Sequence, residues 1–141
     1  MGKVIEKVKL INYDDVSACK RGYVSKEEIR FLETDAIIDT GSVMSSLPRK
    51  IVEQLGLLIE PENQVRLVYA DGRKESVPKA NGLTIIMFGR NWTGECICQE
   101  NSDHVIIGQI PLEQMDLVVD CNKQAVYPNP ENPDQVTLLA L

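Results

Sequence analysis

Along much of the chain, apolar and polar side chains are arranged as expected for β-strands and not for helices. Residues 4–11 alternate between apolar and charged side chains, as a half-buried strand does, and residues 83–88 form a continuous apolar run typical of a buried strand. Further strands are predicted at 29–32, 36–38, 65–70, 74–77, 92–99, 105–107, 117–119 and 125–127. The fold class predicted from this pattern is mainly β.

Two segments have helix signals, and both are short. In residues 47–56, Pro48 suits the first helical position, Ile51 and Leu55 share one face, and Gly56 suits the C-terminal cap. A second helix is predicted to start at Pro111. Between the first two strands, a polar connection is expected to open at residue 13.

The end of the chain differs from the rest in composition. Pro128, Pro130 and Pro133 predict an extended tail from about residue 128. Residues 136–141 then form an apolar strand candidate, which would be an aggregation hazard unless another strand pairs with it.

Length and charge limit the possible functions. The 141 residues are enough for one domain with a substantial core, so a single domain is expected over 1–141. The net charge of −6 argues against nucleic acid or an anionic membrane as a partner. The longest apolar run, residues 83–88, is far too short to cross a bilayer, and the start of the chain has no apolar signal core. A cytoplasmic location is expected.

The cysteines suggest neither disulfides nor a metal site. Cys96 and Cys98 alternate along a predicted strand and face the same side, which suits neither a mutual disulfide nor a Cys-x-x-Cys metal knuckle. His104 is the single histidine, so a zinc site is not expected, and it is interpreted as a surface residue. All four cysteines are expected to be reduced, and no cofactor or metal is predicted.

The candidate chemistry lies in one stretch, Ala36-Ile37-Ile38-Asp39-Thr40-Gly41-Ser42. A buried strand is predicted to end at Asp39, followed by a turn that Gly41 makes possible. Because burying an unpaired carboxylate is costly, something must solvate, pair with or use Asp39.

This stretch resembles the active-site loop of the retropepsin-like aspartic proteases, which reads two apolar residues, Asp, Thr or Ser, Gly, then Ala or Ser. A second motif of that family, apolar-apolar-Gly before a helix, matches Val105-Ile106-Ile107-Gly108. The resemblance covers roughly residues 4–120 and implies a closed β-barrel, the acid protease fold, with one short helix after each motif. A helix at 47–56 is more usual in bacterial and cellular members than in viral ones, so that type is expected.

The resemblance implies an aspartic endopeptidase that acts on a polypeptide substrate. Such catalysis needs two carboxylates about 3 Å apart that share one proton. The chain has one such motif, so Asp39 would have to meet the Asp39 of a second copy in a homodimer. By resemblance, Thr40 would bind the partner's loop, the Gly41 N–H would point at the carboxylates, and Ser42 would donate to the outer carboxylate oxygen.

The substrate-binding residues are also predicted from the resemblance. Asp71-Gly72 is a two-residue hairpin signal at the position of the family's flap. Tyr69, Ala70, Asp71 and Gly72 are therefore predicted to lie at or near the flap tip. Val105 and Ile106 are predicted to line the cleft. An ordinary surface hairpin with Tyr69 in the core remains an alternative for this segment.

Two other functions remain open at this stage. The chain could be a catalytically weak or inactive dimerisation or peptide-binding module of the same fold, or an unrelated small barrel in which Asp39 is a turn residue. If a homodimer forms, its sheet is expected to use a terminal strand, residues 4–10 or 136–141.

Overall fold

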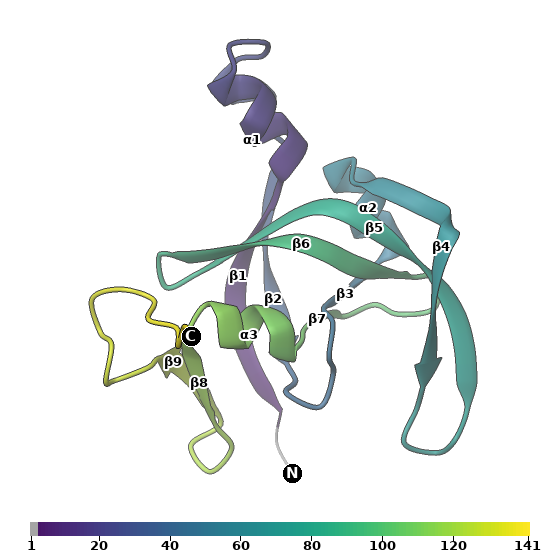
Figure 1. Cartoon of the computed structure of the whole chain (residues 1–141). Helices are drawn as coiled ribbons and strands as arrows, with labels where there is room; N and C mark the ends of the chain where they lie inside the picture. The colour runs from purple at the N-terminus through teal and green to yellow at the C-terminus, as the bar shows by residue number, and fades with distance from the viewer. Residues whose placement is uncertain (1–2) are drawn as a thin grey trace.

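Nine β-strands, three short α-helices and one 3₁₀ turn make up residues 3–141, the part of the chain that the computed structural model describes (Figure 1). The strands are β1 (Val4–Asn12), β2 (Phe31–Ile38), β3 (Ser46–Pro48), β4 (Leu58–Val68), β5 (Lys74–Met87), β6 (Arg90–Gln99), β7 (Val105–Ile107), β8 (Leu117–Asp120) and β9 (Ala125–Pro128). The helical segments are α1 (Tyr13–Lys20), η1 (Lys26–Glu28), α2 (Arg49–Leu55) and α3 (Gln109–Gln114).

Six of the strands close into a barrel, which confirms the predicted mainly β fold class. Their order is β1-β2-β7-β3-β6-β5, and β5 pairs back onto β1 through residues 9–12. β4 extends the sheet beyond the barrel by pairing with β5, whereas β8 and β9 form a separate two-stranded sheet. Closure removes the open edges that a flat sheet of this size would expose.

The barrel interior is filled by the apolar positions of the alternating strands. Leu10, Leu83, Ile85 and Ile107 are fully buried, and Met115 reaches the same cluster from the end of α3. Each of these side chains adds about 1.5–3 kcal/mol of hydrophobic stabilisation relative to an exposed position.

Both predicted helices are present, with small shifts in their ends. α2 begins one residue later than predicted, because Pro48 is its N-cap, and it ends at Gly56, whose φ of 66° is left-handed. That conformation suits glycine because it has no Cβ. α3 begins at Gln109, two residues before Pro111.

The predicted polar connection at residue 13 is wrong, because residues 13–20 form α1. Its N-cap is Asn12, Asp14 and Asp15 lie in its first turn, and Lys20 lies in its last turn. None of its residues is buried, and the helix projects from the barrel on the side opposite the start of β1 (Figure 1). A helix without an apolar face gives no helical periodicity in the sequence.

The predicted hairpin is present, but its turn is longer than two residues. Tyr69 N–H donates to the Arg73 carbonyl oxygen at 2.9 Å, and Gly72 N–H donates to the Tyr69 carbonyl oxygen at 2.9 Å. Gly72 has a φ of 89°, as in a three-residue loop that ends in a left-handed residue.

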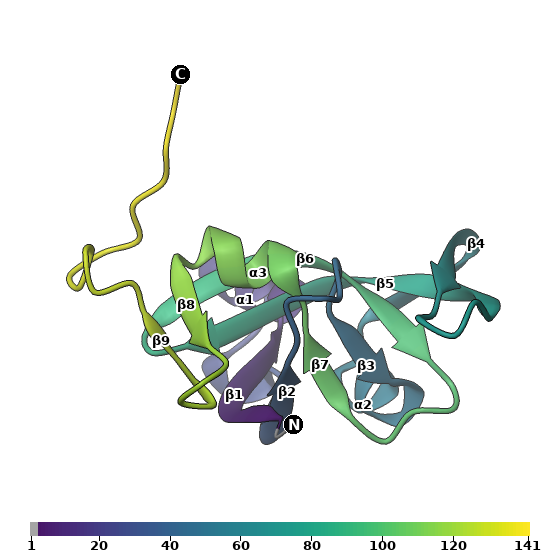
Figure 2. The same cartoon turned by 90° about the horizontal axis from the view of Figure 1, so that it is seen from below.

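After β9, residues 130–135 form a turn and bends, with the Asn132 N–H donating to the Asn129 carbonyl oxygen at 2.9 Å, so the prediction of an extended tail from about residue 128 is wrong there. The terminal strand predicted at 136–141 is also wrong for the isolated chain. These residues pair with no described strand, and Leu138, Leu139 and Leu141 are exposed (Figure 2). An apolar pattern favours a strand, but a strand also needs a partner that supplies main-chain hydrogen bonds.

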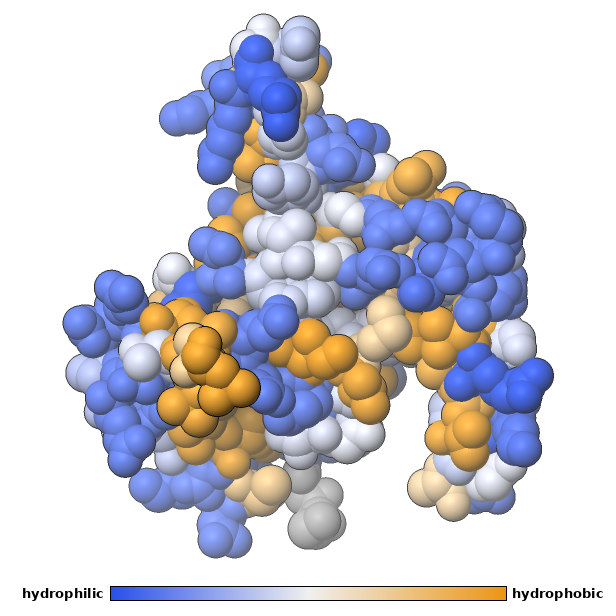
Figure 3. Space-filling view, viewed as in Figure 1, coloured by the Kyte–Doolittle hydropathy of each residue, from blue (hydrophilic) through white to orange (hydrophobic). Residues whose placement is uncertain are grey.

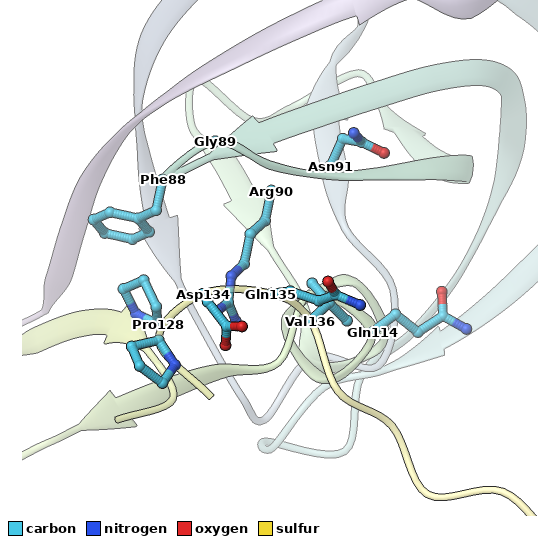
Figure 4. Close-up of a pocket in the computed structure, with 10 residues that line it drawn as sticks. Phe88, Gly89, Arg90, Asn91, Gln114, Pro128, Asp134, Gln135 and Val136 are labelled. Atoms are coloured by element: carbon cyan, nitrogen blue, oxygen red, sulfur yellow. The ribbon is translucent and has the colours of Figure 1, made fainter. Parts of the chain in front are cut away.

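Two side chains hold the first part of the tail against the body. Arg90, 8% exposed, donates to the carbonyl oxygens of Met115, Asp116 and Asn132, and Figure 4 shows it reaching toward the tail. The Asp116 carboxylate accepts from the side-chain amides of Asn129 and Asn132, at 3.1 and 2.8 Å, and from the Thr137 N–H at 3.2 Å.

Among the helices of residues 3–141, none has the length and apolar character needed to cross a membrane.

We predict that Asn12 is a major determinant of stability, since its buried side chain serves two helices. Its Oδ1 accepts from the Asp15 N–H at 2.9 Å, and its Nδ2 donates to the Leu55 and Gly56 carbonyl oxygens at 2.8 and 3.2 Å. Asn12→Ala should lower the free energy of unfolding by about 2–4 kcal/mol, because the α1 cap is lost and buried carbonyls lose their donor. Urea denaturation measures this change.

Two further variants test that explanation of Asn12. Asn12→Asp keeps the acceptor for α1 but turns an oxygen toward the α2 carbonyls, so it should destabilise at least as much as alanine. Asn101→Ala, at an exposed asparagine, should change stability by less than about 0.5 kcal/mol. A stable Asn12→Asp variant would contradict the role assigned to the donor.

We also predict that acid releases the tail. Hydrogen bonds from Asn129 and Asn132, with smaller contributions from the Thr137 N–H and Arg90, lower the pKa of Asp116. When the tail detaches, Asp116 loses these hydrogen bonds, so its carboxyl binds a proton more readily in the detached state than in the anchored state. The anchoring is therefore complete above about pH 4 and is lost as the pH falls further. Hydrogen exchange at the Thr137 amide should accelerate, relative to α2 amides, on acidification.

The matched variant for the acid release is Asp116→Asn, which keeps a side-chain oxygen but cannot ionise. Its Thr137 amide should exchange faster at neutral pH and show no additional acid dependence. An acid response equal to that of the unmodified protein would show that another group controls the tail.

Candidate active site

Asp39 is positioned by the pairing of two strands that are far apart in the sequence. β2 runs parallel to β7, with Ile38 opposite Ile107. The Asp39 N–H continues this ladder by donating to the Ile107 carbonyl oxygen at 3.0 Å. The two motifs noted in the sequence therefore lie side by side, and the acid stands at the end of a buried strand.

The loop after β2 supplies hydrogen bonds to the carboxylate itself. The Gly41 N–H donates to Oδ1 of Asp39 at 2.9 Å, and Oγ of Ser42 donates to Oδ2 at 3.3 Å. Asp39 is half-buried, and among residues 3–141 no basic side chain forms an ion pair with it. The carboxylate is therefore oriented by hydrogen bonds from its own loop and not by an ion pair with another described residue.

The start of α3 fixes the other end of this loop. Main-chain N–H groups of Gln109 and Ile110 donate to the carbonyl oxygens of Ser42 and Val43, at 2.6 and 3.1 Å. These contacts tie the loop to the segment that follows the second motif, so Asp39 is held from both sides.

Gly108 is required where these two segments cross. A Cβ at this position would lie 2.6 Å from the main-chain carbon of Met44 and 2.7 Å from the main-chain oxygen of Ser42. The Gly108 N–H also donates to Oγ of the fully buried Ser45 at 3.1 Å. The glycine of the second motif is thus needed because two backbones approach each other closely. It is not needed for an unusual conformation, since its φ of −93° is an ordinary extended value.

Two grooves flank the candidate loop, and both are lined by Thr40 and Val119. The larger, of about 440 Å³, contains Asp39 and is lined further by Lys3, Val4, Ile37, Ile38, Cys121, Asn122 and Gln124. The smaller, of about 260 Å³, is lined further by Gln109, Leu112, Glu113, Asp116 and Leu117. In the larger groove Asp39 is the single carboxylate among the described lining residues, so this groove by itself holds no pair of carboxylates.

The β4–β5 hairpin stands across an open notch from the loop that carries Asp39 (Figure 3). Within the hairpin, the Tyr69 hydroxyl donates to Glu75 at 2.9 Å and accepts from Nε2 of Gln99 at 3.3 Å, and the Arg73 guanidinium lies 4.6 Å from the ring centre. Desolvation and the Glu75 carboxylate raise the pKa of Tyr69. Tyr69 is half-buried and links the hairpin to β6, so it is not part of the barrel core.

The remaining predicted residues fall into two groups. Ala70, Asp71 and Gly72 are exposed at the hairpin turn, where an ion pair of 2.8 Å joins Asp71 to Arg73. On β7, Ile106 is half-buried, whereas Val105 is 3% exposed and packs in the core. Of the two predicted cleft residues, only Ile106 is therefore accessible in this chain.

The cysteines and the histidine lie away from the Asp39 carboxylate, apart from Cys121 in the larger groove. All four cysteines are free, and burial raises the pKa of Cys96 to about 12. His104 is exposed. Within residues 3–141, no three His, Cys, Asp or Glu side chains come together as a metal site.

Neither a protein-family model nor a curated protein matches the chain. What the loop does therefore has to follow from its geometry and chemistry.

Several residues of this site have no signal in the sequence. Gln109 and Ile110 act through their main chains, which any residue type supplies. The β8–β9 turn reads as an ordinary polar turn, and only the three-dimensional arrangement brings Val119 and Cys121 beside Asp39. Ser45 could have been noticed as a buried hydroxyl after the motif, since buried polar groups need partners.

Proposed function

We propose that the protein is an aspartic endopeptidase of the retropepsin-like type that works as a homodimer. The observation that carries this proposal is the Asp39 carboxylate at the end of β2, which is oriented by the Gly41 N–H and Ser42 and forms no ion pair within residues 3–141. Two such loops around a two-fold axis would place two carboxylates together.

In the proposed reaction, the two Asp39 carboxyl groups share one proton. The ionised carboxylate draws a proton from a water held between them, and the water attacks the scissile carbonyl carbon. The protonated carboxyl donates its proton to the carbonyl oxygen, and collapse of the tetrahedral intermediate then releases the amine as it is protonated. Two carboxyl groups about 3 Å apart cannot both be ionised, so the apparent pKa values belong to the pair and not to either residue.

The other parts of the chain suit the binding of an extended peptide. The notch between the β4–β5 hairpin and the Asp39 loop is open (Figure 3), and the exposed turn of the hairpin brings main-chain groups to its rim. A peptide in the notch would pair with strand edges through main-chain hydrogen bonds. Ile106 would contribute an apolar wall, which favours apolar substrate side chains.

The roles of Thr40 and Gly41 also follow from their surroundings. Thr40 is exposed and makes no side-chain hydrogen bond within residues 3–141, so its hydroxyl is available to a partner loop. Gly41 has little space beside it, because a Cβ would lie 3.1 Å from Oδ1 of Asp39.

The test of the proposed function is peptide cleavage by the purified protein and by Asp39→Asn. The variant keeps the size of the side chain but supplies neither acid nor base, so the cleavage rate should fall by at least about 10²–10⁴-fold. Cleavage by the unmodified protein should be blocked by pepstatin, and sedimentation should show that the variant still forms dimers. Full cleavage by Asp39→Asn would refute the mechanism, and a dimer that binds peptides without cutting them would support the inactive binding module instead.

We predict that Ser42 sets the acid side of the pH–rate profile. Its hydroxyl donates to Asp39, and a hydrogen bond to an ionised carboxylate favours the ionised form. Ser42→Ala should therefore have a less acidic pH optimum than the unmodified enzyme. Ser102→Ala, at a serine that hydrogen-bonds only within its own loop, is the control and should leave the optimum unchanged. An unchanged or more acidic optimum in Ser42→Ala would contradict the assignment.

A further inference from the structure

A second cavity as large as the groove at Asp39 lies where the tail passes the turn between β5 and β6. It measures about 440 Å³ and is lined by residues 88–91, Gln114, Pro128 and residues 133–136 (Figure 4). Among the described residues, it shares no lining residue with either groove beside the Asp39 loop. Its volume lies in the range of about 300–1,000 Å³ that is typical of small-molecule sites.

Phe88, in the wall of this cavity, has a backbone conformation that its residue type disfavours. With Gly89 it forms the two-residue turn between β5 and β6, and the φ angles of the two residues are 54° and 74°. Such a turn favours Asn, Asp or Gly at its first position, because a bulky side chain is strained at positive φ. The Phe88 ring is also 45% exposed and lies over Pro128 at one side of the cavity (Figure 4). Because strained residues concentrate at functional sites, the ring indicates a surface on which a ligand stacks.

Neutral hydrogen-bonding side chains dominate the rest of the cavity wall. Asn91, Gln114 and Gln135 are exposed, and none of their side-chain amides makes a hydrogen bond within residues 3–141. Each amide has two donors and one acceptor oxygen, so the three together can both give and receive hydrogen bonds. The exposed Asp134 carboxylate adds further acceptors.

The charges at the cavity disfavour an anionic ligand. Arg90 is the single basic residue among the described lining residues, and its guanidinium already donates to three main-chain carbonyl oxygens. Asp134 would repel an anion at the same place. The cavity therefore suits a neutral molecule with many hydroxyl groups and one apolar face. A sugar ring has both features, because its hydroxyls donate and accept while its C–H face can stack on an aromatic ring.

We propose that this cavity binds a neutral sugar, with one ring stacked on Phe88 and its hydroxyls bonded to the amides of Asn91, Gln114 and Gln135. Residues 133–136 of the wall belong to the tail, so a bound sugar holds the tail against the body of the protein and opposes its release. The site is separate from Asp39 and does not depend on the proposed endopeptidase activity.

An NMR titration of the full chain with glucose, galactose, mannose, maltose and cellobiose tests the sugar site. With at least one of these sugars, the side-chain amide signals of Asn91, Gln114 and Gln135 should shift together and give a single dissociation constant. At a sugar concentration of about ten times that constant, hydrogen exchange at the Thr137 amide should slow by about tenfold, because the detached tail no longer completes the site. The α2 amides serve as the internal reference and should not slow in the same proportion.

Two variants at exposed aromatic residues test the stacking surface. Phe88→Asn keeps a residue that tolerates positive φ but removes the ring, so it should weaken sugar binding by about tenfold. Tyr23→Asn, at a side chain 79% exposed after α1, is the matched control and should bind the sugar as the unmodified protein does.

Three results would overturn the sugar site. The first is the absence of any shift of the three amide signals with every sugar of the panel, up to the limit of solubility. The second is equal sugar affinity in Phe88→Asn and the unmodified protein. The third is a response of the same signals to inorganic phosphate or to a peptide in place of the sugars.

Discussion

The hydrogen bond from the Asp39 N–H to the Ile107 carbonyl oxygen determines where the acid stands. It extends the parallel pairing of β2 with β7, so the direction in which the chain leaves the barrel is set by two buried strands. The bonds from Gln109 and Ile110 then fix the far end of the loop. A carboxylate on a free loop would lose its orientation to thermal motion, whereas this one is held at both ends by main-chain bonds. The geometry proposed for catalysis depends on this arrangement.

Most strands could be predicted because a half-buried strand leaves a two-residue period in its own sequence. The predictions were wrong where the local sequence pattern differs from what the rest of the fold provides as a packing or pairing partner. α1 has a good N-cap at Asn12 and a basic residue, Lys20, in its last turn, but it has no apolar face, so periodicity could not reveal it. Residues 136–141 are apolar enough for a strand, yet they pair with no described strand. Sequence pattern shows what a segment prefers, while its partner depends on the whole fold.

In the candidate site too, some residues could be predicted from the local sequence, while others depend on the whole fold. Asp39, Thr40, Gly41 and Ser42 could be selected as candidates because they lie within one loop, and the structure shows that Gly41 and Ser42 contact the carboxylate directly. The closeness of Val119 to that loop was not predictable, because about eighty residues separate them and only barrel closure brings them together. Tyr69 is a similar case, since its hydroxyl bonds depend on Gln99 in a different strand pair.

The crossing at Gly108 has a consequence for the timing of folding. The loop that carries Asp39 is complete only when residues 105–110 have paired with it, although the acid itself is made in the first third of the chain. Contacts this distant in sequence form late, because a long segment must first be closed into a loop. During synthesis, a nascent chain therefore carries its acid in an unassembled state until most of the barrel has emerged from the ribosome.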